Sequence, residues 1–146
     1  DLLELARDAA ESLRPLAERR RVRLSVVPGS APGRADPGQL RQVLVNLIAN
    51  AIKFNKEGGS VSVSARVRDG LVEVSVEDTG LGIPPGDLPR VFERFYRVDK
   101  ARSREQGGTG LGLSIAKHLV EANGGSIAAE SAEGQGSVFR FHVSAA

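Results

Sequence analysis

The sequence predicts an α+β domain, and two patterns in the distribution of apolar residues support this. Apolar residues recur at helical spacing in three stretches, residues 2–20, 36–53 and 111–122. Alternation typical of strands occupies five others: residues 22–27, 61–67, 72–76, 126–131 and 137–143. A chain of 146 residues is long enough to bury one hydrophobic core. We therefore expect a single domain covering residues 1–146.

The composition excludes several classes of protein. Hydrophobic residues make up 40% of the chain and charged residues 26%, as in ordinary globular domains. The formal charge of +2 is too small to indicate a nucleic-acid surface. The absence of cysteine rules out disulfides and thiolate metal sites. No apolar run is long enough to span a bilayer, so we expect a segment that is not inserted in the membrane, and the absence of cysteine fits a cytoplasmic location. Because the chain starts inside a helical pattern, we expect it to be a fragment of a longer protein.

The first helix and strand are scaffold elements. Residues 2–20 carry a regular apolar stripe, within which Pro15 is expected to produce a kink because it lacks a backbone donor. Residues 22–27 alternate as a strand and end at Pro28-Gly29.

The second helix combines a strong start signal with an unusual polar face. Asp36 is a good N-cap, Pro37 suits the first helical position, and Gln39 completes a capping box. Asn46, Asn50 and Lys53 lie at spacings of four and three, which places them on one face, away from the apolar stripe. Two explanations are open: hydrogen-bonded core asparagines, or amide oxygens for a hard cation with an ammonium group for phosphate.

A β-hairpin follows. The Asp69-Gly70 pair predicts a type I′ turn. A two-residue loop then places Val67 opposite Val72, and Arg66 opposite Glu73. The second strand leads into Asp78-Thr79-Gly80-Leu81-Gly82-Ile83, where a carboxylate followed by two glycines either lets a ligand approach the backbone or forms an Asp-initiated turn.

The segment from about 83 to 109 is expected to be a lid. A short helical piece near residues 87–95 precedes a polar tail, residues 96–106, that has little to bury. Its four cations can supply charge to a polyphosphate, although a solvated loop would look similar: Arg97, Lys100, Arg102 and Arg104. We expect residues 97–106 to be mobile without nucleotide.

The glycine-rich stretch Gly107-Gly108-Thr109-Gly110-Leu111-Gly112 runs directly into the third helix. A glycine loop at a helix N-terminus presents unpaired N–H groups to a phosphate, whereas an ordinary turn before a core helix is the alternative. The spacing fits neither a P-loop nor a Rossmann loop. The helix should end at Asn123-Gly124-Gly125. The two histidines, His118 and His142, are expected to be incidental surface residues.

Together these segments resemble the catalytic, ATP-binding domain of a bacterial two-component sensor histidine kinase. Five motifs match in order over essentially the whole chain: the asparagine helix (Asn46-Leu-Ile-Ala-Asn50-Ala-Ile-Lys53-Phe54), a first glycine box (Asp78-Thr-Gly80-Leu-Gly82), a phenylalanine box (Phe92-Glu-Arg-Phe95-Tyr-Arg97), a second glycine box (Gly108-Thr-Gly110-Leu-Gly112-Leu) and a third (Gly134-Gln-Gly136-Ser137-Val-Phe139). The resemblance implies a two-layer α/β sandwich, in which three helices cover a mixed, mostly antiparallel sheet and a flexible lid covers ATP.

The resemblance also implies a role for each matching residue. Asn50 would bind Mg²⁺ with support from Asn46, and Lys53 and Arg97 would contact the phosphates; Asn50, Lys53 and Arg97 form the expected catalytic set. Asp78 would accept a hydrogen bond from the adenine amino group, with Phe54, Gly82 and Ser137 against the same base. The remaining nucleotide-binding positions are Gly80, Ile83, Gly108, Thr109, Gly110, Leu111, Gly112 and Leu113.

The resemblance implies phosphoryl transfer from ATP-Mg to a histidine on a dimerisation domain absent from this chain. The partners would be that phosphoacceptor domain and a response regulator, but no nucleic acid, and the whole kinase would be anchored in the cell membrane. Related ATPases place a glutamate base where this chain has Asn46, which cannot activate water.

Two alternative functions fit the sequence less well. A serine kinase of the anti-sigma-factor type would carry that glutamate and lack the phenylalanine box. A nucleotide-sensing pseudokinase would lack a metal or phosphate residue, and none is missing here.

Overall fold

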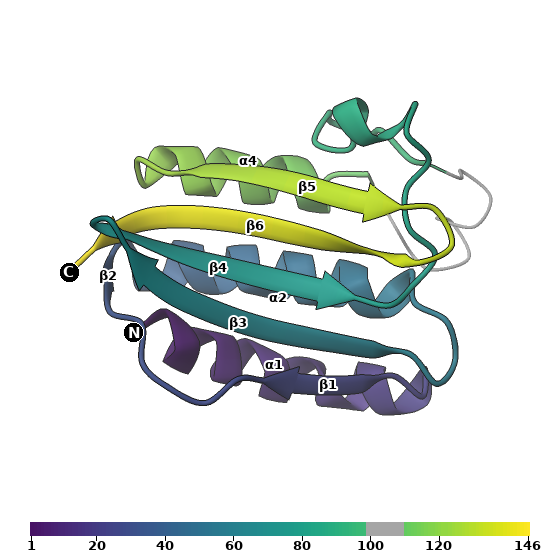
Figure 1. Cartoon of the computed structure of the whole chain (residues 1–146), viewed down its shortest axis with the longest axis horizontal. Helices are drawn as coiled ribbons and strands as arrows, with labels where there is room; N and C mark the ends of the chain where they lie inside the picture. The colour runs from purple at the N-terminus through teal and green to yellow at the C-terminus, as the bar shows by residue number, and fades with distance from the viewer. Residues whose placement is uncertain (99–109) are drawn as a thin grey trace.

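The computed structural model describes residues 1–98 and 110–146, and Figure 1 shows the arrangement of their elements. The elements in chain order are α1 (Leu2–Arg19), β1 (Arg23–Val26), β2 (Gly33–Arg34), α2 (Pro37–Lys53), β3 (Ser60–Arg68), β4 (Leu71–Asp78), the 3₁₀ turn η1 (Leu88–Arg90), α4 (Gly112–Ala122), β5 (Ser126–Ala132) and β6 (Gly136–Ala145).

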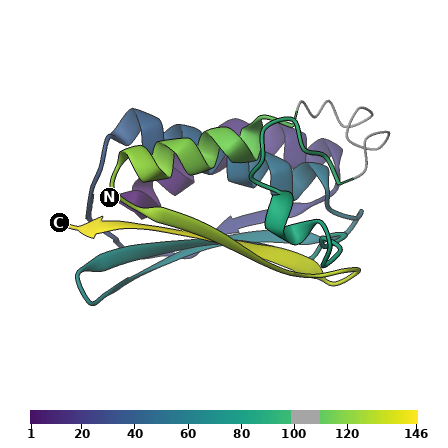
Figure 2. The ribbon, with the colours of Figure 1, turned by 90° about the horizontal axis from the view of Figure 1, so that it is seen from above.

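The described elements form two layers. Strands β1, β3, β4 and β6 lie side by side in that order, and β2 and β5 both pair with β6. Only the β1–β3 pair is parallel among the described strands. Figure 2 shows the three α-helices together on one face of this twisted sheet, while the other face is left open. The predicted α+β, two-layer sandwich with a mixed, mostly antiparallel sheet is confirmed.

The core lies between the layers and is centred on α2. That helix packs against α1 on one side and α4 on the other. Its predicted apolar stripe is buried, with Leu40, Leu44 and Ile48 fully enclosed. The sheet contributes alternate residues of three central strands: Val61, Val63, Val72, Val74, Val76, Phe139, Phe141 and Val143. Because α2 is fixed by packing on both sides, its polar face is held in a defined direction.

The β3–β4 hairpin has the predicted register. Val67 lies opposite Val72, and Arg66 lies opposite Glu73. Asp69 and Gly70 have φ values of +53° and +76°, which are the left-handed conformations that a type I′ turn requires at both central positions. The turn therefore sets the register of the hairpin, in which β4 ends at Asp78 opposite Val61.

Several local expectations were wrong. The predicted helical piece at residues 87–95 is reduced to η1, and Phe95 takes a left-handed φ of +64°, which a continuing helix does not allow. The short strand β2 was not predicted, because two residues carry no alternation.

The capping box of α2 is completed by a residue from another helix. The Asp36 carboxylate accepts from the Gln39 N–H across 2.9 Å, as predicted. The Gln39 side chain does not reach back to Asp36; the Asp36 N–H instead donates to the Asn123 side chain across 2.8 Å. Asn123 in turn donates to Gln39 Oε1. The end of α4 is thus joined to the start of α2.

Two further expectations concern the lid and the membrane. Most of the lid tail, with Lys100, Arg102, Arg104, Gly108 and Thr109, lies outside the described residues. None of the helices in residues 1–98 and 110–146 is long and apolar enough to cross a bilayer.

Candidate functional site

The predicted site residues gather at one end of the sandwich. The last residues of α2 and β4, the first turn of α4 and the β5–β6 turn all lie at this end, on the right in Figure 1. Hydrogen bonds join these segments, as described below, although they are far apart in sequence. The structure therefore brings together the asparagine helix, the first and third glycine boxes and the described residues of the second, 110–113.

The two asparagines of α2 have different surroundings. Asn46 Nδ2 donates to the Gly112 carbonyl oxygen of α4 across 3.1 Å, and its Oδ1 accepts from Gln42 Nε2 across 2.8 Å. The half-buried Asn50 side chain makes no hydrogen bond with any other described residue. The geometry therefore leaves the Asn50 amide oxygen available to a ligand, whereas Asn46 already joins two helices.

Asp78 closes the end of β4 as a half-buried carboxylate. Its Oδ1 accepts from the Gly80 N–H across 2.9 Å. Burial is the main cause that raises the pKa of Asp78 above its ordinary value of 3.8, and the neighbouring Glu77 acts in the same direction. The N–H groups of Gly80 and Ser137 act in the opposite direction but do not cancel the effect of burial. Asp78 is thus a confined hydrogen-bond acceptor, which suits recognition of a donor group.

The first glycine box lies against the end of α2. The Leu81 N–H donates to the Phe54 carbonyl oxygen across 3.2 Å. A Cβ on the buried Gly80 would come within 2.6 Å of that same oxygen, so only glycine fits there. This contact brings Phe54, the C-cap residue of α2, next to the segment that follows Asp78.

The third glycine box forms the opposite wall. Gly82 has a φ of +71°, and a Cβ there would overlap the carbonyl of Ala132. The Gly134 N–H donates to the Leu81 carbonyl oxygen across 2.7 Å. Ser137, on β6 directly opposite Asp78 of β4, is only 7% exposed.

One residue at this wall was not predicted from the sequence. Ser131 Oγ accepts from the Ile83 N–H across 2.7 Å and lies 2.8 Å from Ser137 Oγ. It belongs to none of the five motifs, and a single serine on a strand has no local sequence signature. Only the pairing of β5 with β6 reveals it.

The N-terminus of α4 differs from those of α1 and α2. Asp1 caps α1 and Asp36 caps α2, each through its side chain, whereas Leu111 at the start of α4 makes no side-chain cap. The first N–H groups of α4 lie at the positive end of its dipole, which is a favourable position for an anion. The preceding Gly110 carbonyl accepts from the Phe95 N–H across 2.8 Å, which ties the phenylalanine box to the second glycine box.

The two phenylalanines of the phenylalanine box have different surroundings: one packs against the core and the other is exposed. Phe92 packs edge-to-face on Phe139, with ring centroids 5.9 Å apart. Phe95 is 64% exposed. The half-buried Arg97 makes no hydrogen bond or ion pair within the described residues.

Lys53 lies in the last turn of α2, and its carbonyl oxygen accepts from Arg20 Nη1 across 3.4 Å.

The side chains at this site could hold a magnesium ion together with a nucleotide, but they offer too few ligands to hold one alone. No group of three or more His, Cys, Asp or Glu residues in the described part of the chain could hold a metal ion. Asn50 offers one amide oxygen, a ligand type that Mg²⁺ accepts alongside substrate phosphates and water. The residues therefore fit a magnesium ion that is held mainly by a polyphosphate.

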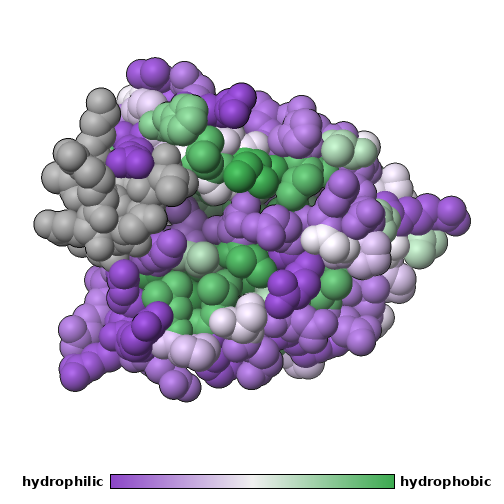
Figure 3. Space-filling view, turned by 180° about the vertical axis from the view of Figure 1, so that it is seen from behind, coloured by the Kyte–Doolittle hydropathy of each residue, from purple (hydrophilic) through white to green (hydrophobic). Residues whose placement is uncertain are grey.

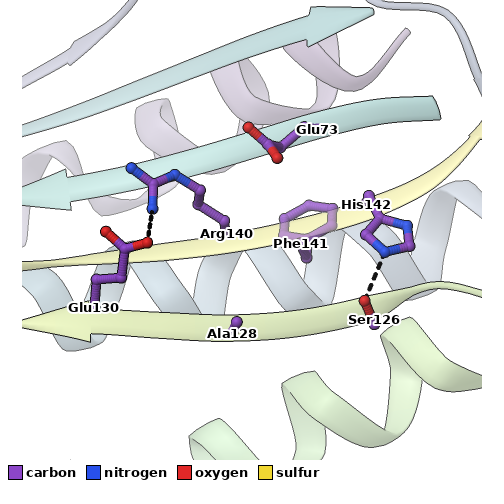
Figure 4. A pocket seen from close by; sticks show the side chains of 7 residues that line it. All are labelled: Glu73, Ser126, Ala128, Glu130, Arg140, Phe141 and His142. Carbon is purple, nitrogen blue, oxygen red and sulfur yellow. Dashed lines mark hydrogen bonds and ion pairs between the residues drawn. The ribbon is translucent and has the colours of Figure 1, made fainter. Parts of the chain in front are cut away.

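A separate hollow of about 160 Å³ lies on the open face of the sheet and shares no residue with this site. Figure 4 shows its lining, in which Arg140 pairs with Glu130 at 2.9 Å and Ser126 contacts His142 Nε2 at 2.6 Å. His142 lies on the open face of the sheet, as predicted, where it is half-buried and hydrogen-bonded. His118 on α4 is exposed, as expected.

Comparison with known proteins identifies the family. The family model described as "Histidine kinase-, DNA gyrase B-, and HSP90-like ATPase" matches residues 35–146. The sensor histidine kinase WalK of Bacillus subtilis is 53% identical over 108 residues, which cover 73% of this chain and 18% of WalK.

Solved structures of histidine kinases resemble the structure of this chain. Full-length ShkA, crystallised with AMPPNP, matches the whole chain with a TM-score of 0.84 and 36% identity, over 31% of the ShkA chain. The catalytic domain of the histidine kinase ThkA matches 97% of this chain and 91% of its own, with a TM-score of 0.82 and 29% identity. The chain thus spans about a fifth of the length of WalK and nearly all of the ThkA catalytic domain. On the site geometry and these matches, the chain belongs to the histidine kinase-, DNA gyrase B- and HSP90-like ATPase family, and within it to the catalytic ATP-binding domains of sensor histidine kinases.

Proposed function

We propose that this chain binds ATP with Mg²⁺ and transfers the γ-phosphoryl group to a histidine of its kinase's dimerisation domain, as a step in two-component signalling. The observation that carries the proposal is the junction of α2 with α4. There the first turn of α4 lies against α2, held by the 3.1 Å bond from Asn46 to the Gly112 carbonyl oxygen. We infer that the N–H groups at the start of α4 bind phosphate and that Asn50, one turn after Asn46 on α2, binds the magnesium ion beside them.

At the adenine end, the recognising groups are Asp78 and Ser137. Asp78 would accept from the exocyclic amino group, because its carboxylate is an acceptor confined by burial. Ser137 lies opposite Asp78 in the strand register, so both side chains can form hydrogen bonds with the same edge of the base. Phe54 would contact the base from the end of α2.

At the phosphate end, the chain's own contribution is position and positive charge. Asn50 would hold the magnesium ion, which neutralises phosphate charge when bound. Lys53 and Arg97 would offset charge on the transferring group. The N–H groups from Gly110 to Leu113 would bind the remaining phosphate oxygens, because they lie at the positive end of the α4 dipole.

Transfer is favoured over hydrolysis because no general base stands at Asn46. An amide cannot take a proton from water at neutral pH, and both polar groups of Asn46 are engaged with Gln42 and Gly112. A site of this kind delivers the phosphoryl group only to a nucleophile supplied by another domain.

The phenylalanine box provides a surface for that domain. Phe95 is 64% exposed, and its N–H is bonded to Gly110 of the second glycine box. Ile115, in the first turns of α4, is 41% exposed. Figure 3 shows apolar side chains gathered over α4 on the helix-bearing side. We propose that the dimerisation domain docks here, and that a response regulator then receives the phosphoryl group from its histidine.

Isothermal titration calorimetry of the chain with ATP tests this proposal at its first step. We expect binding in the presence of Mg²⁺ and a marked loss of affinity when EDTA is added. Binding of ATP with the same affinity in EDTA would contradict the magnesium assignment, and no binding in either buffer would contradict the proposal itself.

A further inference from the structure

We propose that Ser131 is a positioning residue that directs the hydroxyl proton of Ser137 toward the adenine base. This inference rests on the proposed function, because it takes ATP as the ligand. It concerns a residue of β5 that need not touch the nucleotide and acts through Ser137 on β6.

The position of Ser131 follows from the alternation of side chains along β5. Ser126, Ala128 and Glu130 line the hollow on the open face of the sheet. Side chains at odd positions point to the other face, and there Ile127 and Ala129 pack against the core. Ser131 therefore faces the helix side, at the end of the strand nearest Asp78 and the start of the lid.

Three polar atoms surround the Ser131 hydroxyl. The Ile83 N–H donates to it across 2.7 Å, the Gly136 carbonyl oxygen lies at 3.0 Å, and Ser137 Oγ lies at 2.8 Å. A serine hydroxyl has one proton to donate and two lone pairs that accept. The Ile83 N–H occupies one lone pair, so the single proton of Ser131 must choose between Gly136 and Ser137.

The two choices have opposite consequences for Ser137. If Ser131 donates to Gly136, its remaining lone pair accepts the Ser137 proton, and Ser137 can then only accept from a ligand. If Ser131 donates to Ser137, the Ser137 proton is free to point at the ligand. The adenine ring nitrogen N1 is an acceptor beside the amino group that Asp78 would bind, so adenine favours the second arrangement.

The second arrangement is a chain of hydrogen bonds that begins at the lid. It runs from the Ile83 N–H to Ser131, from Ser131 to Ser137, and from Ser137 to N1, directly or through a bridging water. Each bond polarises the next one, which strengthens the series. Because Ser137 is only 7% exposed, bulk water can scarcely take over the role of Ser131. Ser131 would thereby couple the base of the lid to recognition of adenine.

The test compares ATP with 1-deaza-ATP, in which N1 is replaced by a C–H group. Calorimetry in Mg²⁺ buffer is performed on the chain, on Ser131→Ala and on Ser131→Thr. We expect Ser131→Ala to lower the affinity for ATP about 3- to 10-fold more than the affinity for 1-deaza-ATP. Ser131→Thr keeps the hydroxyl and should keep the preference for ATP. In a Ser137→Ala background, Ser131→Ala should not change the ratio of the two affinities.

The controls separate this role from a structural one. Ser126→Ala removes a hydroxyl from the same strand, bonded to His142 on the open face, and should change neither affinity. Thermal unfolding of each variant checks that it folds. An equal loss for both nucleotides in Ser131→Ala, or no loss, would overturn the inference while leaving ATP binding by the parent chain intact. Failure of the parent chain to bind ATP would instead overturn the proposed function, and this inference with it.

Discussion

Asn46 of α2 and Gly112 of α4 are joined by a hydrogen bond of 3.1 Å from side chain to backbone. The bond fastens the polar face of one helix to the first turn of another, 66 residues later in the sequence. It uses the donor of Asn46, while the acceptor of the same amide takes a bond from Gln42. Asn46 is thus a hydrogen-bonded asparagine, one of the two explanations that the sequence left open, whereas the Asn50 side chain makes no hydrogen bond within the described residues, and its role as a cation ligand stays a prediction.

The first prediction concerns this bond. Asn46→Ala should weaken ATP binding and lower the free energy of unfolding by about 0.5–1.5 kcal/mol, because the first turn of α4 loses its anchor. Gln42→Ala is the matched control, since it removes only the neighbouring bond within α2. Calorimetry and denaturant titration measure both effects. Equal behaviour of the two variants would show that the bond to Gly112 does not position the phosphate-binding turn.

The second prediction concerns Asn50. Asn50→Ala should strongly weaken Mg²⁺-dependent ATP binding and leave the fold intact, because its side chain is only half-buried and is not part of the buried apolar stripe that contains Leu47 and Ala51. The affinity that remains should no longer respond to EDTA. If the variant still lost affinity on addition of EDTA as the parent chain does, Asn50 would not be the magnesium ligand.

The third prediction concerns the choice of base. Asp78 can accept from the amino group of adenine, whereas guanine presents a carbonyl oxygen at that position, and two acceptors repel. A buried polar group left unpaired costs about 1–3 kcal/mol, so ATP should bind roughly 10- to 100-fold more tightly than GTP. Competition between the two nucleotides measures this ratio. Comparable affinities would remove Asp78 from base recognition.

The fourth prediction concerns the stability of the nucleotide-free protein. Burial raises the pKa of Asp78 above 3.8, so the folded chain holds this proton more tightly than the unfolded chain does. The contribution of Asp78 to stability is therefore full below pH 3.8 and falls as pH rises through the elevated pKa. Asp78→Asn is neutral at every pH and keeps an acceptor for the Gly80 N–H. It should be more stable than the parent chain at pH 7, with the difference disappearing below pH 3.8.

Thermal or denaturant unfolding of Asp78→Asn at a series of pH values measures that difference. The same variant should bind ATP less well, because it offers an amide where adenine meets a carboxylate. A variant less stable than the parent at pH 7 would show that the ionised carboxylate is favoured by its surroundings.

Features set by neighbouring residues could be predicted from the sequence, and features set by distant contacts could not. The turn at Asp69-Gly70 determines the register of the hairpin, and the glycines after Ala122 end α4. The roles of Ser131 and Asn123 depend on strand pairing and on a contact across 87 residues. At residues 87–95 the helical pattern was misleading, because the bond from the Phe95 N–H to Gly110 replaces the bond that helix formation would have made.

The proposed function claims that this chain transfers the γ-phosphoryl group of ATP to a histidine that it does not itself contain. Its two histidines lie on the exposed side of α4 and on the open face of the sheet, where His142 is bonded to Ser126. Incubation with γ-labelled ATP, alone and with the histidine-bearing dimerisation domain of its kinase, tests the claim most directly. We predict no label on the chain alone, and acid-labile, base-stable label on the added domain, which Asn50→Ala abolishes. Robust acid-labile label on the isolated chain, or none on the added domain when ATP is bound, would contradict it.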